Sequence, residues 1–425
     1  MSVVTAADVA VEFGATTVFQ GVGFTVSRGD RWGIVGRNGS GKTTLFRVLT
    51  GELEPTRGTV TRTGAPRFTH LDQHRAFPEG ATVWDAAAQP FQALARLEQS
   101  LAEQADAMAR GDASPEAMER YDRDLERFQR EGGYSMEARV DRVLSGLGFD
   151  ADVARTTPVS TLSGGEAGRG GLARQLVAPA DIYLLDEPTN HLDLATTAWL
   201  EDYLKELDAT VLLISHDRAF LDDVVDHVLH FEAGTAHAYD GSYAHFVRQR
   251  EERRTTRRRA HEQQQKTIDR EEAFIRKNIA GQNTNQAKSR RKQLARLPRL
   301  SPPPSAEGVM SVRLDPGRRG GEQVLVADDV RLEIPGGERA NGEGGDGGRT
   351  LLDDFSAILH RGDVVGLVGP NGSGKSTLLR AVAGERSVDG GELRVGASID
   401  LAWYRQDMTQ IPTDTTLYDI ISDLR

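Results

Sequence analysis

Two short segments of the sequence carry a residue pattern that binds phosphate groups. The pattern is glycine, any four residues, glycine, lysine and then serine or threonine, and it occurs at residues 36–43 and 369–376. Glycines let the backbone approach an anion closely, so that successive N–H groups and a following helix N-terminus surround the phosphates. The lysine reaches the terminal phosphates, and the hydroxyl after it is a ligand for Mg²⁺. We therefore predict two sites for ATP and Mg²⁺.

The two loops supply most of the candidate binding residues, and each also supplies one candidate metal ligand, Thr43 or Ser376. In the first loop the binding residues are Gly36, Asn38, Gly39, Ser40, Gly41, Lys42, Thr43 and Thr44. In the second loop they are Gly369, Asn371, Gly372, Ser373, Gly374, Lys375, Ser376 and Thr377. The longer segments around them, 30–47 and 363–380, are so alike that they indicate a duplicated domain.

A pair of acidic residues supplies the chemistry that a phosphate loop lacks. Residues 182–190 read as an apolar strand that ends in Asp186 and Glu187. We expect Asp186 to hold Mg²⁺, through the water of that ion, and Glu187 to polarise the attacking water as a general base. This pattern predicts ATP hydrolysis.

These side chains need a sheet to position them, and the sequence predicts one. Apolar runs at 31–35, 181–185 and 210–214 are typical of parallel strands that are covered on both faces. Residues 92–130 instead repeat their apolar side chains at helical spacing on both sides of a Gly-Asp-Ala-Ser-Pro break, which predicts a helical hairpin. Residues 1–242 therefore form an α/β domain with a helical insertion.

The segment that follows is basic. Between His245 and Arg299 there are seventeen Lys or Arg and six Asp or Glu, a local net charge of +11, whereas the whole chain has −11. We predict two long exposed helices here, broken near residues 280–285, and a disordered glycine-rich loop at 336–349. Such charge asymmetry indicates an anionic partner. The alternative is a solvated linker that only keeps the chain soluble.

Composition excludes several other classes of protein. No apolar run reaches the roughly 18 residues that a membrane-spanning helix needs, and the N-terminus has no signal-peptide pattern. The chain has no cysteine, so disulfides and thiolate chemistry are excluded. We expect a cytoplasmic protein without a membrane partner.

The order of further short motifs resembles the ATP-binding cassette proteins. Residues 162–166 resemble their signature motif, with Ser163, Gly164 and Gly165 closing over the γ-phosphate that the opposite cassette holds. The resemblance assigns three more roles. Gln73 lies near Mg²⁺, His216 contacts the γ-phosphate, and Phe13 stacks on adenine.

One branch of these proteins, the ABC-F family, matches best. The joined motifs at 186–193 and 215–221 resemble it, and so do 131–134, 143–149, 239–243 and the linker residues 285–292. The resemblance implies a soluble cytosolic ATPase with tandem cassettes. Many ABC-F proteins insert the linker into the ribosome near the P-site tRNA, and others have been linked to DNA. The 92–130 hairpin would be the arm of the first cassette.

The resulting fold class is α/β, with tandem P-loop NTPase domains joined by a long helical linker and an incomplete second domain. We assign 1–242 to the first cassette, 243–305 to the linker and 306–425 to the N-terminal part of the second cassette. The sequence departs from the family pattern at Ala167, where Gln is usual, and at Ile334, where an aromatic residue would stack on adenine. Gln406 remains as the glutamine of the second metal site.

The end of the second domain has a mechanistic consequence. No second signature, acid pair or switch histidine follows Gln406, and cassettes hydrolyse ATP at sites that two cassettes share. We expect the chain to be a fragment of a longer protein, or to pair with another copy, and to be weakly active or inactive alone. The favoured function is an ATPase coupled to ribosome, rRNA or tRNA binding. The alternatives are a DNA-binding ABC ATPase and a nucleotide-binding module without turnover. A transporter subunit is disfavoured.

Overall fold

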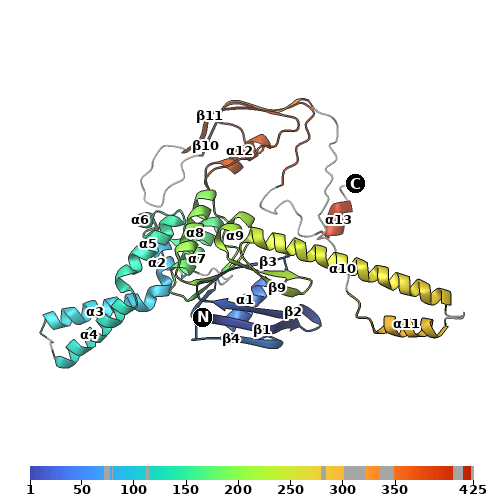
Figure 1. The fold of residues 1–425 in the computed structure, drawn as a ribbon. Coiled ribbons are helices and arrows are strands. Elements are labelled where there is room, and N and C mark those ends of the chain that lie inside the picture. Colours follow the sequence, from blue (N-terminus) through green and yellow to red (C-terminus); the bar gives the residue numbers. More distant parts are fainter. Residues whose placement is uncertain are drawn as a thin grey trace. The chain divides into compact units, whose positions relative to one another are not determined.

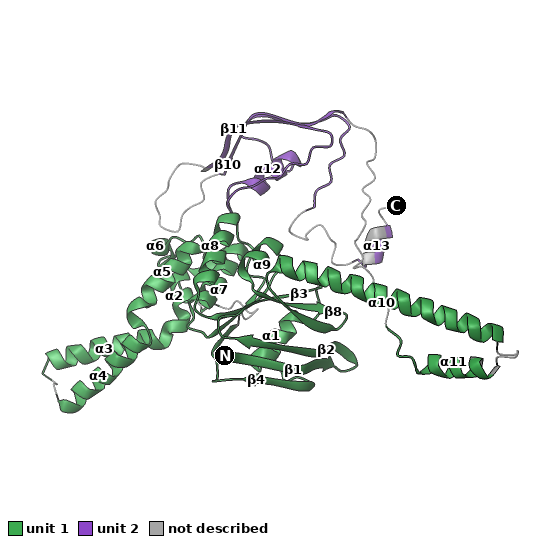
Figure 2. Ribbon diagram, viewed as in Figure 1, with its two compact units in different colours: residues 1–309 green, residues 310–425 purple. Residues whose placement is uncertain are grey.

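The computed structural model describes residues 1–70, 77–78, 80–111, 114–278, 284–300, 321–334, 349–404 and 415–422, to which all structural statements refer. The chain divides into two compact units, residues 1–309 and 310–425, coloured green and purple in Figure 2. The predicted Gln73 and Gln406, and all but the last residue of the glycine-rich loop, lie outside the described residues. No described helix is both long and apolar enough to cross a membrane.

A six-stranded sheet forms the centre of unit 1. Its order is β5-β6-β7-β3-β8-β9, and all neighbouring strands are parallel except β9, which is antiparallel to β8. The strands are β3 (Arg31–Gly36), β5 (Phe68–His70), β6 (Ile182–Asp186), β7 (Thr210–Ile214), β8 (His227–Glu232) and β9 (Thr235–Asp240). The three predicted apolar strands are confirmed as β3, β6 and β7, which are neighbours in the middle of the sheet.

A second sheet and one helix cover the first face of the central sheet. Strands β1 (Ser2–Phe13), β2 (Thr16–Ser27) and β4 (Arg57–Arg62) form an antiparallel sheet with order β2-β1-β4. Helix α1 (Lys42–Thr50) lies between the two sheets (Figure 1) and buries Leu45, Phe46 and Leu49 in one apolar cluster with both of them. The start of α1, which follows the phosphate loop, is therefore fixed from two sides.

Helices cover the opposite face. The apolar cluster on this side includes side chains from most of them. They are α2 (Val83–Ala88), α5 (Met136–Gly146), α6 (Ala151–Ala154), α7 (Gly164–Val177), α8 (Leu194–Glu206) and α9 (Arg218–Val224). The predicted hairpin is confirmed as α3 (Gln92–Ala109) and α4 (Pro115–Arg130), which run side by side (Figure 1) and bury Leu101 and Phe128.

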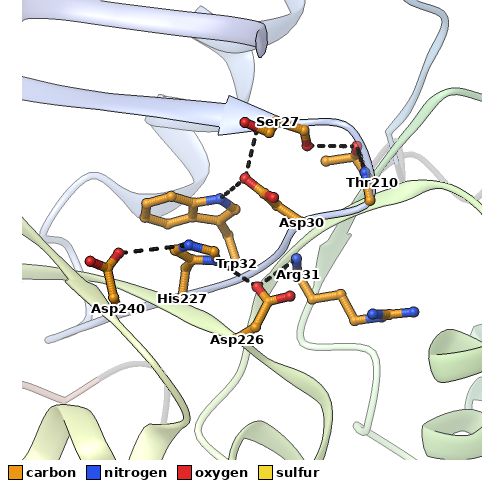
Figure 3. A network of polar contacts seen from close by, with 9 residues as sticks. Ser27, Asp30, Arg31, Trp32, Thr210, Asp226, His227 and Asp240 are labelled. Carbon is orange, nitrogen blue, oxygen red and sulfur yellow. Dashed lines mark hydrogen bonds and ion pairs between the residues drawn. The ribbon is translucent and has the colours of Figure 1, made fainter. Parts of the chain in front are cut away.

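A polar network fixes the start of β3, the strand that leads to the first phosphate loop (Figure 3). The Trp32 ring stacks on His227, with 4.7 Å between ring centroids. Asp226 Oδ1 accepts a hydrogen bond from the Arg31 backbone N–H at 2.9 Å and lies 2.6 Å from His227 Nδ1. Trp32 Nε1 donates to Asp30 Oδ2 at 3.4 Å. These contacts join β3 to β8 at the edge of the sheet opposite the phosphate loop.

The two predicted linker helices are confirmed as α10 (Tyr243–Asn278) and α11 (Thr284–Arg296). The outer part of α10 packs against α11 through Arg290. The guanidinium of Arg290 donates to both carboxylate oxygens of Glu271, at 3.0 and 3.1 Å, and lies 4.1 Å from the centroid of the Phe274 ring. Gln264 of α10 donates to the Pro298 carbonyl at 2.9 Å, although most other side chains of the hairpin are exposed.

Unit 2 repeats the antiparallel sheet and the helix of unit 1. Strands β10 (Gln323–Ile334), β11 (Arg349–His360) and β12 (Gly390–Val395) have the order β11-β10-β12, and α12 (Lys375–Val382) packs on them. Helix α13 (Leu417–Ser422) follows. The repeat would place a strand like β3 before the second phosphate loop, but 363–370 form none. Strand β3 pairs with β7 and β8, and the described part of unit 2 has no such neighbours. Val364 is consequently 99% exposed.

Candidate functional site

The first phosphate loop joins β3 to α1 and is packed tightly at two glycines, Gly36 beside Phe231 and Gly41 beside β2. Gly41 caps α1 with a φ of 95°, a conformation that favours glycine. A Cβ there would lie 2.7 Å from side-chain atoms of both Val18 and Phe19 of β2. Gly39 also has a positive φ, of 77°, but a Cβ on it would meet nothing within 4 Å. Glycine therefore suits the backbone conformation at both Gly39 and Gly41, but close packing also requires it at Gly41.

This difference gives a paired prediction. Gly41→Ala is expected to lower the melting temperature more than Gly39→Ala, because it adds a clash with β2, of about 1–3 kcal/mol, to the cost of the left-handed backbone. It should also weaken ATP binding, since α1 and the loop must shift. Calorimetric melting and nucleotide titration of the two variants check this. Equal melting temperatures would show that the loop is not packed against β2.

The lysine of the loop is buried. Lys42 is only 8% exposed, and its ammonium donates to the carbonyl oxygens of Gly36 and Arg37 at 2.9 and 3.1 Å. Burial lowers the pKa of Lys42, while Glu187 and Asp186 nearby act in the opposite direction. A further anion at the loop, such as a phosphate, would stabilise the charged form of Lys42.

The structure brings the hydroxyl of the loop to the first acid. Thr43 Oγ1 donates to Asp186 Oδ2 at 2.7 Å. A hydroxyl and a carboxylate oxygen are ligands that Mg²⁺ prefers, so these residues fit the ion. The described residues contain no group of three or more His, Cys, Asp or Glu that could hold a metal. Mg²⁺ here would complete its coordination with phosphate oxygens and water, as is usual for nucleotide sites.

The second acid lies beside the predicted switch histidine. Glu187 follows β6 and His216 follows β7, and because these parallel strands are neighbours their carboxyl ends meet. The His216 backbone N–H donates to Glu187 Oε2 at 3.3 Å, and its Nε2 lies 3.5 Å from Glu187 Oε1. His216 Nε2 also lies 3.1 Å from Asn38 Oδ1 on the phosphate loop. The predicted residues of three separate segments therefore share one edge of the sheet.

Burial raises the pKa of the Glu187 carboxyl, and His216 opposes this shift through its charge and its backbone N–H. Glu187 also has a φ of 50°, which is uncommon outside glycine. Its backbone N–H donates to the Ile214 carbonyl at 2.8 Å, which holds this conformation. A carboxylate whose pKa is raised is a stronger base, as general-base catalysis requires.

The predicted signature motif begins a helix. Ser163 caps α7, accepting from the Glu166 backbone N–H at 3.3 Å, while Glu166 Oε2 accepts from the Ser163 backbone N–H at 2.9 Å. This capping box forms even though Gly168 and Gly170 weaken the first turns of the helix. A Cβ on Gly164 would meet nothing within 4 Å, whereas one on Gly165 would lie 3.7 Å from the His191 Cβ, so the start of α7 is open at Gly164.

The aromatic candidate ends the first strand of unit 1. Phe13 is the last residue of β1 and is 52% exposed. The next strand places Val18 and Phe19 against Gly41, so this hairpin leads directly to the phosphate loop. Ile334 ends β10 in the same way in unit 2 and is also exposed. The structure thus leaves an exposed ring at the predicted adenine position of the first cassette.

The second phosphate loop has the same local form as the first. Lys375 Nζ donates to the carbonyl oxygens of Gly369 and Pro370 at 2.7 and 2.6 Å. Gly374 has a φ of 94°, and a Cβ there would lie 2.9 Å from Leu351 of β11. Ser376 follows in the first turn of α12.

Sequence reasoning missed the residues that hold the far end of α7. Arg139 of α5 donates to the Leu176 carbonyl at 3.2 Å and to the Tyr183 hydroxyl oxygen at 3.0 Å. The Tyr183 hydroxyl donates to the Ala178 carbonyl at 2.7 Å, and the Tyr203 hydroxyl donates to the Leu176 carbonyl at 3.1 Å. Tyr183 reads as an ordinary core residue of β6, so no pattern in the sequence distinguishes it.

The core of unit 1 and the residues at its edge define a P-loop ATPase of the ATP-binding cassette class. The family model described as ABC transporter matches residues 19–190 and 352–420, and a second model with that description matches 229–313. The matched segments include both phosphate loops, the acid pair and the linker helices.

Three similar proteins show which family within the ATP-binding cassette class the chain belongs to. The energy-dependent translational throttle protein EttA of Escherichia coli is 30% identical over 417 residues, covering 95% of this chain and 70% of EttA. The uncharacterized ABC transporter ATP-binding protein YfmR of Bacillus subtilis is 31% identical, covering 100% of this chain and 64% of YfmR. The ATP-binding protein Uup of E. coli is 29% identical, covering 92% and 59%. The chain belongs to the ABC-F family and spans less than two thirds of YfmR and Uup.

Proposed function

We propose that the first cassette binds ATP with Mg²⁺ and hydrolyses it when a second cassette completes the site. The observation that carries this proposal is the meeting of Thr43, Asp186, Glu187 and His216 at the carboxyl edge of the central sheet. Lys42 and the loop N–H groups would bind the phosphates, and the exposed ring of Phe13 would stack on adenine. Mg²⁺, when bound by Thr43 and Asp186, supplies positive charge that neutralises the phosphate oxygens.

Each residue has a defined part in the reaction. Glu187 accepts a proton from water, whose oxygen forms a bond to the γ-phosphorus while the bond to the β,γ-bridging oxygen breaks. The products are ADP and hydrogen phosphate, which keeps one hydrogen of the water, and Glu187 then releases the other as a proton to solvent. His216 orients the γ-phosphate beside Glu187. Ser163, Gly164 and Gly165 would act on the nucleotide of the opposite cassette, which the exposure of Ser163 and Gly164 allows.

The second loop would bind ATP through Lys375 and Ser376. Because hydrolysis needs the loop of one cassette and the signature of another, we expect this chain alone to turn over slowly, and its cassettes to work in pairs. If the chain binds nucleotide without hydrolysing it, the chain would instead be a nucleotide-binding module. A concentration series distinguishes the two, since pairing between chains makes turnover rise faster than protein concentration.

The linker, residues 243–305, is the proposed contact with the ribosome, through rRNA or tRNA, in the cytoplasm. Two observations support it. Most side chains of α10 and α11 are exposed, and the segment carries a local net charge of +11. The name of EttA links that relative to translation. A DNA-binding role is the alternative, and preference for branched DNA over ribosomes would favour it.

The structure refines which linker residues to test. Arg290 is engaged with Glu271 and Phe274, whereas Arg291 and Lys292 are exposed. Replacing Arg291 and Lys292 together by Gln is expected to weaken ATP-dependent co-sedimentation with ribosomes. Each lost phosphate contact should make the negative slope of log affinity against log salt shallower by about 1. Arg290→Gln should instead loosen the α10–α11 hairpin, which hydrogen exchange would report.

A matched control comes from the arm, which also has exposed arginines. Arg120→Gln with Arg123→Gln on α4 removes the same charge without touching the linker. Unchanged co-sedimentation of the linker variant, or equal loss in the arm variant, would remove the linker from ribosome binding.

A further inference from the structure

A cleft of about 280 Å³ lies between the first phosphate loop, the loop that carries His216 and the start of α10. Gly36 and Arg37 line one side, His216 and Arg218 line another, and Tyr243 and Arg250 of α10 line a third. We call it the linker-root cleft. All of its residues belong to unit 1.

The walls of the cleft on the α10 side are held firmly. Phe246 is buried, with its ring 5.2 Å from the ring of His230 and 5.1 Å from that of Tyr239. Arg250 forms an ion pair with Glu232 of β8 at 3.4 Å. The Ala244 backbone N–H donates to Asp222 Oδ1 at 2.7 Å. The cleft is therefore formed before any ligand enters, which lowers the cost of binding.

The charge of the cleft favours an anion. Its lining contains three arginines and two histidines and no acidic side chain. Arg250 is neutralised by Glu232, but the guanidinium groups of Arg37 and Arg218 have no side-chain partner among the described residues. Two arginines that line one cavity without a lining carboxylate are typical of sites for phosphate, whose oxygens accept the paired N–H donors of a guanidinium group.

The cleft adjoins the candidate ATP site and is not part of it. It shares Gly36, Arg37 and His216 with that site, whereas Lys42, Thr43, Asp186 and Glu187 do not line it. His216 stands at the boundary. Its Nε2 lies 3.1 Å from Asn38 Oδ1 and 3.5 Å from Glu187 Oε1, and the same residue lines the cleft. A phosphate that is cleaved from the γ-position of bound ATP and moves past His216 would enter the cleft.

We propose that the linker-root cleft binds the inorganic phosphate released by ATP hydrolysis, before the phosphate leaves the protein. This inference rests on the proposed function. The size of the cleft suits the ligand, because about 280 Å³ holds a phosphate and several waters at roughly 30 Å³ for each water. Arg218 and Arg37 bind the phosphate oxygens, while Lys42, which does not line the cleft, holds the nucleotide.

The test uses the full chain with saturating ADP and Mg²⁺, and inorganic phosphate as the probe. Isothermal titration should show phosphate binding in the millimolar range with ADP present. Arg218→Gln should weaken phosphate binding by about tenfold, because it removes a charge-assisted hydrogen bond, and should leave ADP binding unchanged. Arg110→Gln, at the end of α3 and away from the cleft, should bind phosphate like the original chain.

Three results would overturn the proposal. The first is no phosphate binding with ADP present. The second is equal phosphate affinity in Arg218→Gln, with melting curves showing that the variant is folded. The third is phosphate binding that disappears in Lys42→Ala and persists in Arg218→Gln, which would place the phosphate at the γ-position. If ADP and ATP fail to bind at all, the proposed function fails, while phosphate titration of the nucleotide-free chain still tests the cleft.

Discussion

Replacing Lys42 by Ala is expected to lower the affinity of the first site for ATP by about 100-fold or more. The Lys42 ammonium is buried and already lies against the carbonyls of Gly36 and Arg37, within reach of any phosphate in the loop. Truncating one partner of such a charged, desolvated pair costs about 2–5 kcal/mol, and about 1.4 kcal/mol corresponds to a tenfold change in affinity. Titration with a non-hydrolysable ATP analogue measures the loss directly.

The second loop provides an internal comparison. Lys375→Ala should remove binding at the second site only, and the double variant should remove both, so stoichiometry separates the two sites. Lys205→Ala serves as the surface control, because Lys205 pairs with Asp223 and belongs to neither loop. Binding at the original stoichiometry and affinity in Lys42→Ala would contradict the assigned role.

The Lys42→Ala substitution should lower the affinity for ATP without a comparable loss of folding stability. Burial lowers the pKa of Lys42, so the folded state disfavours the charged form that the unfolded chain carries at neutral pH. Removing the ammonium relieves that cost and offsets part of the lost packing. Lys42→Ala should therefore stay folded, and its melting curve would show that lost affinity is not lost structure.

The sequence predicted the parts of the site that depend on local pattern. Strands β3, β6 and β7 follow from apolar runs, and the loop at Gly36–Thr43 follows from glycine spacing. The meeting of Glu187 with His216 depends instead on β6 and β7 being neighbours. Strand β3 precedes β6 and β7 in the chain, but in the sheet it lies next to β7 on the side away from β6. Such an order results from long-range packing, which no local pattern encodes.

Residues 363–370 also show that a local pattern does not decide the structure by itself. They repeat the β3 sequence closely, yet no strand forms and Val368 is 75% exposed. Strand preference reflects packing against neighbouring strands more than an intrinsic property of the backbone. Arg290 is a second example, since charge counting treats it like Arg291 although it binds Glu271 within the hairpin. In both cases the neighbours decide the outcome.

Replacing Glu187 by Gln is expected to lower ATP turnover by about 100- to 10,000-fold while ATP binding is retained. The amide keeps the size of the side chain and its contact with the His216 backbone N–H but cannot accept the proton of the attacking water. ATP turnover is measured over a range of chain concentrations, because two cassettes must pair to form the working site. ATP is kept below the chain concentration, so that the chemical step is followed. Glu201→Gln on α8 is the matched control, since burial also raises the pKa of that carboxyl.

The pH dependence separates a base from a structural residue. Burial raises the pKa of Glu187, so the carboxylate takes up a proton at a higher pH than an ordinary glutamate does. Only the carboxylate accepts a proton from water, so turnover should fall as the pH drops through this raised pKa. The Gln variant has no group to titrate there, and its residual turnover should lose that acidic limb. An unchanged acidic limb in the Gln variant, or turnover equal to that of the original chain, would assign the base to another residue.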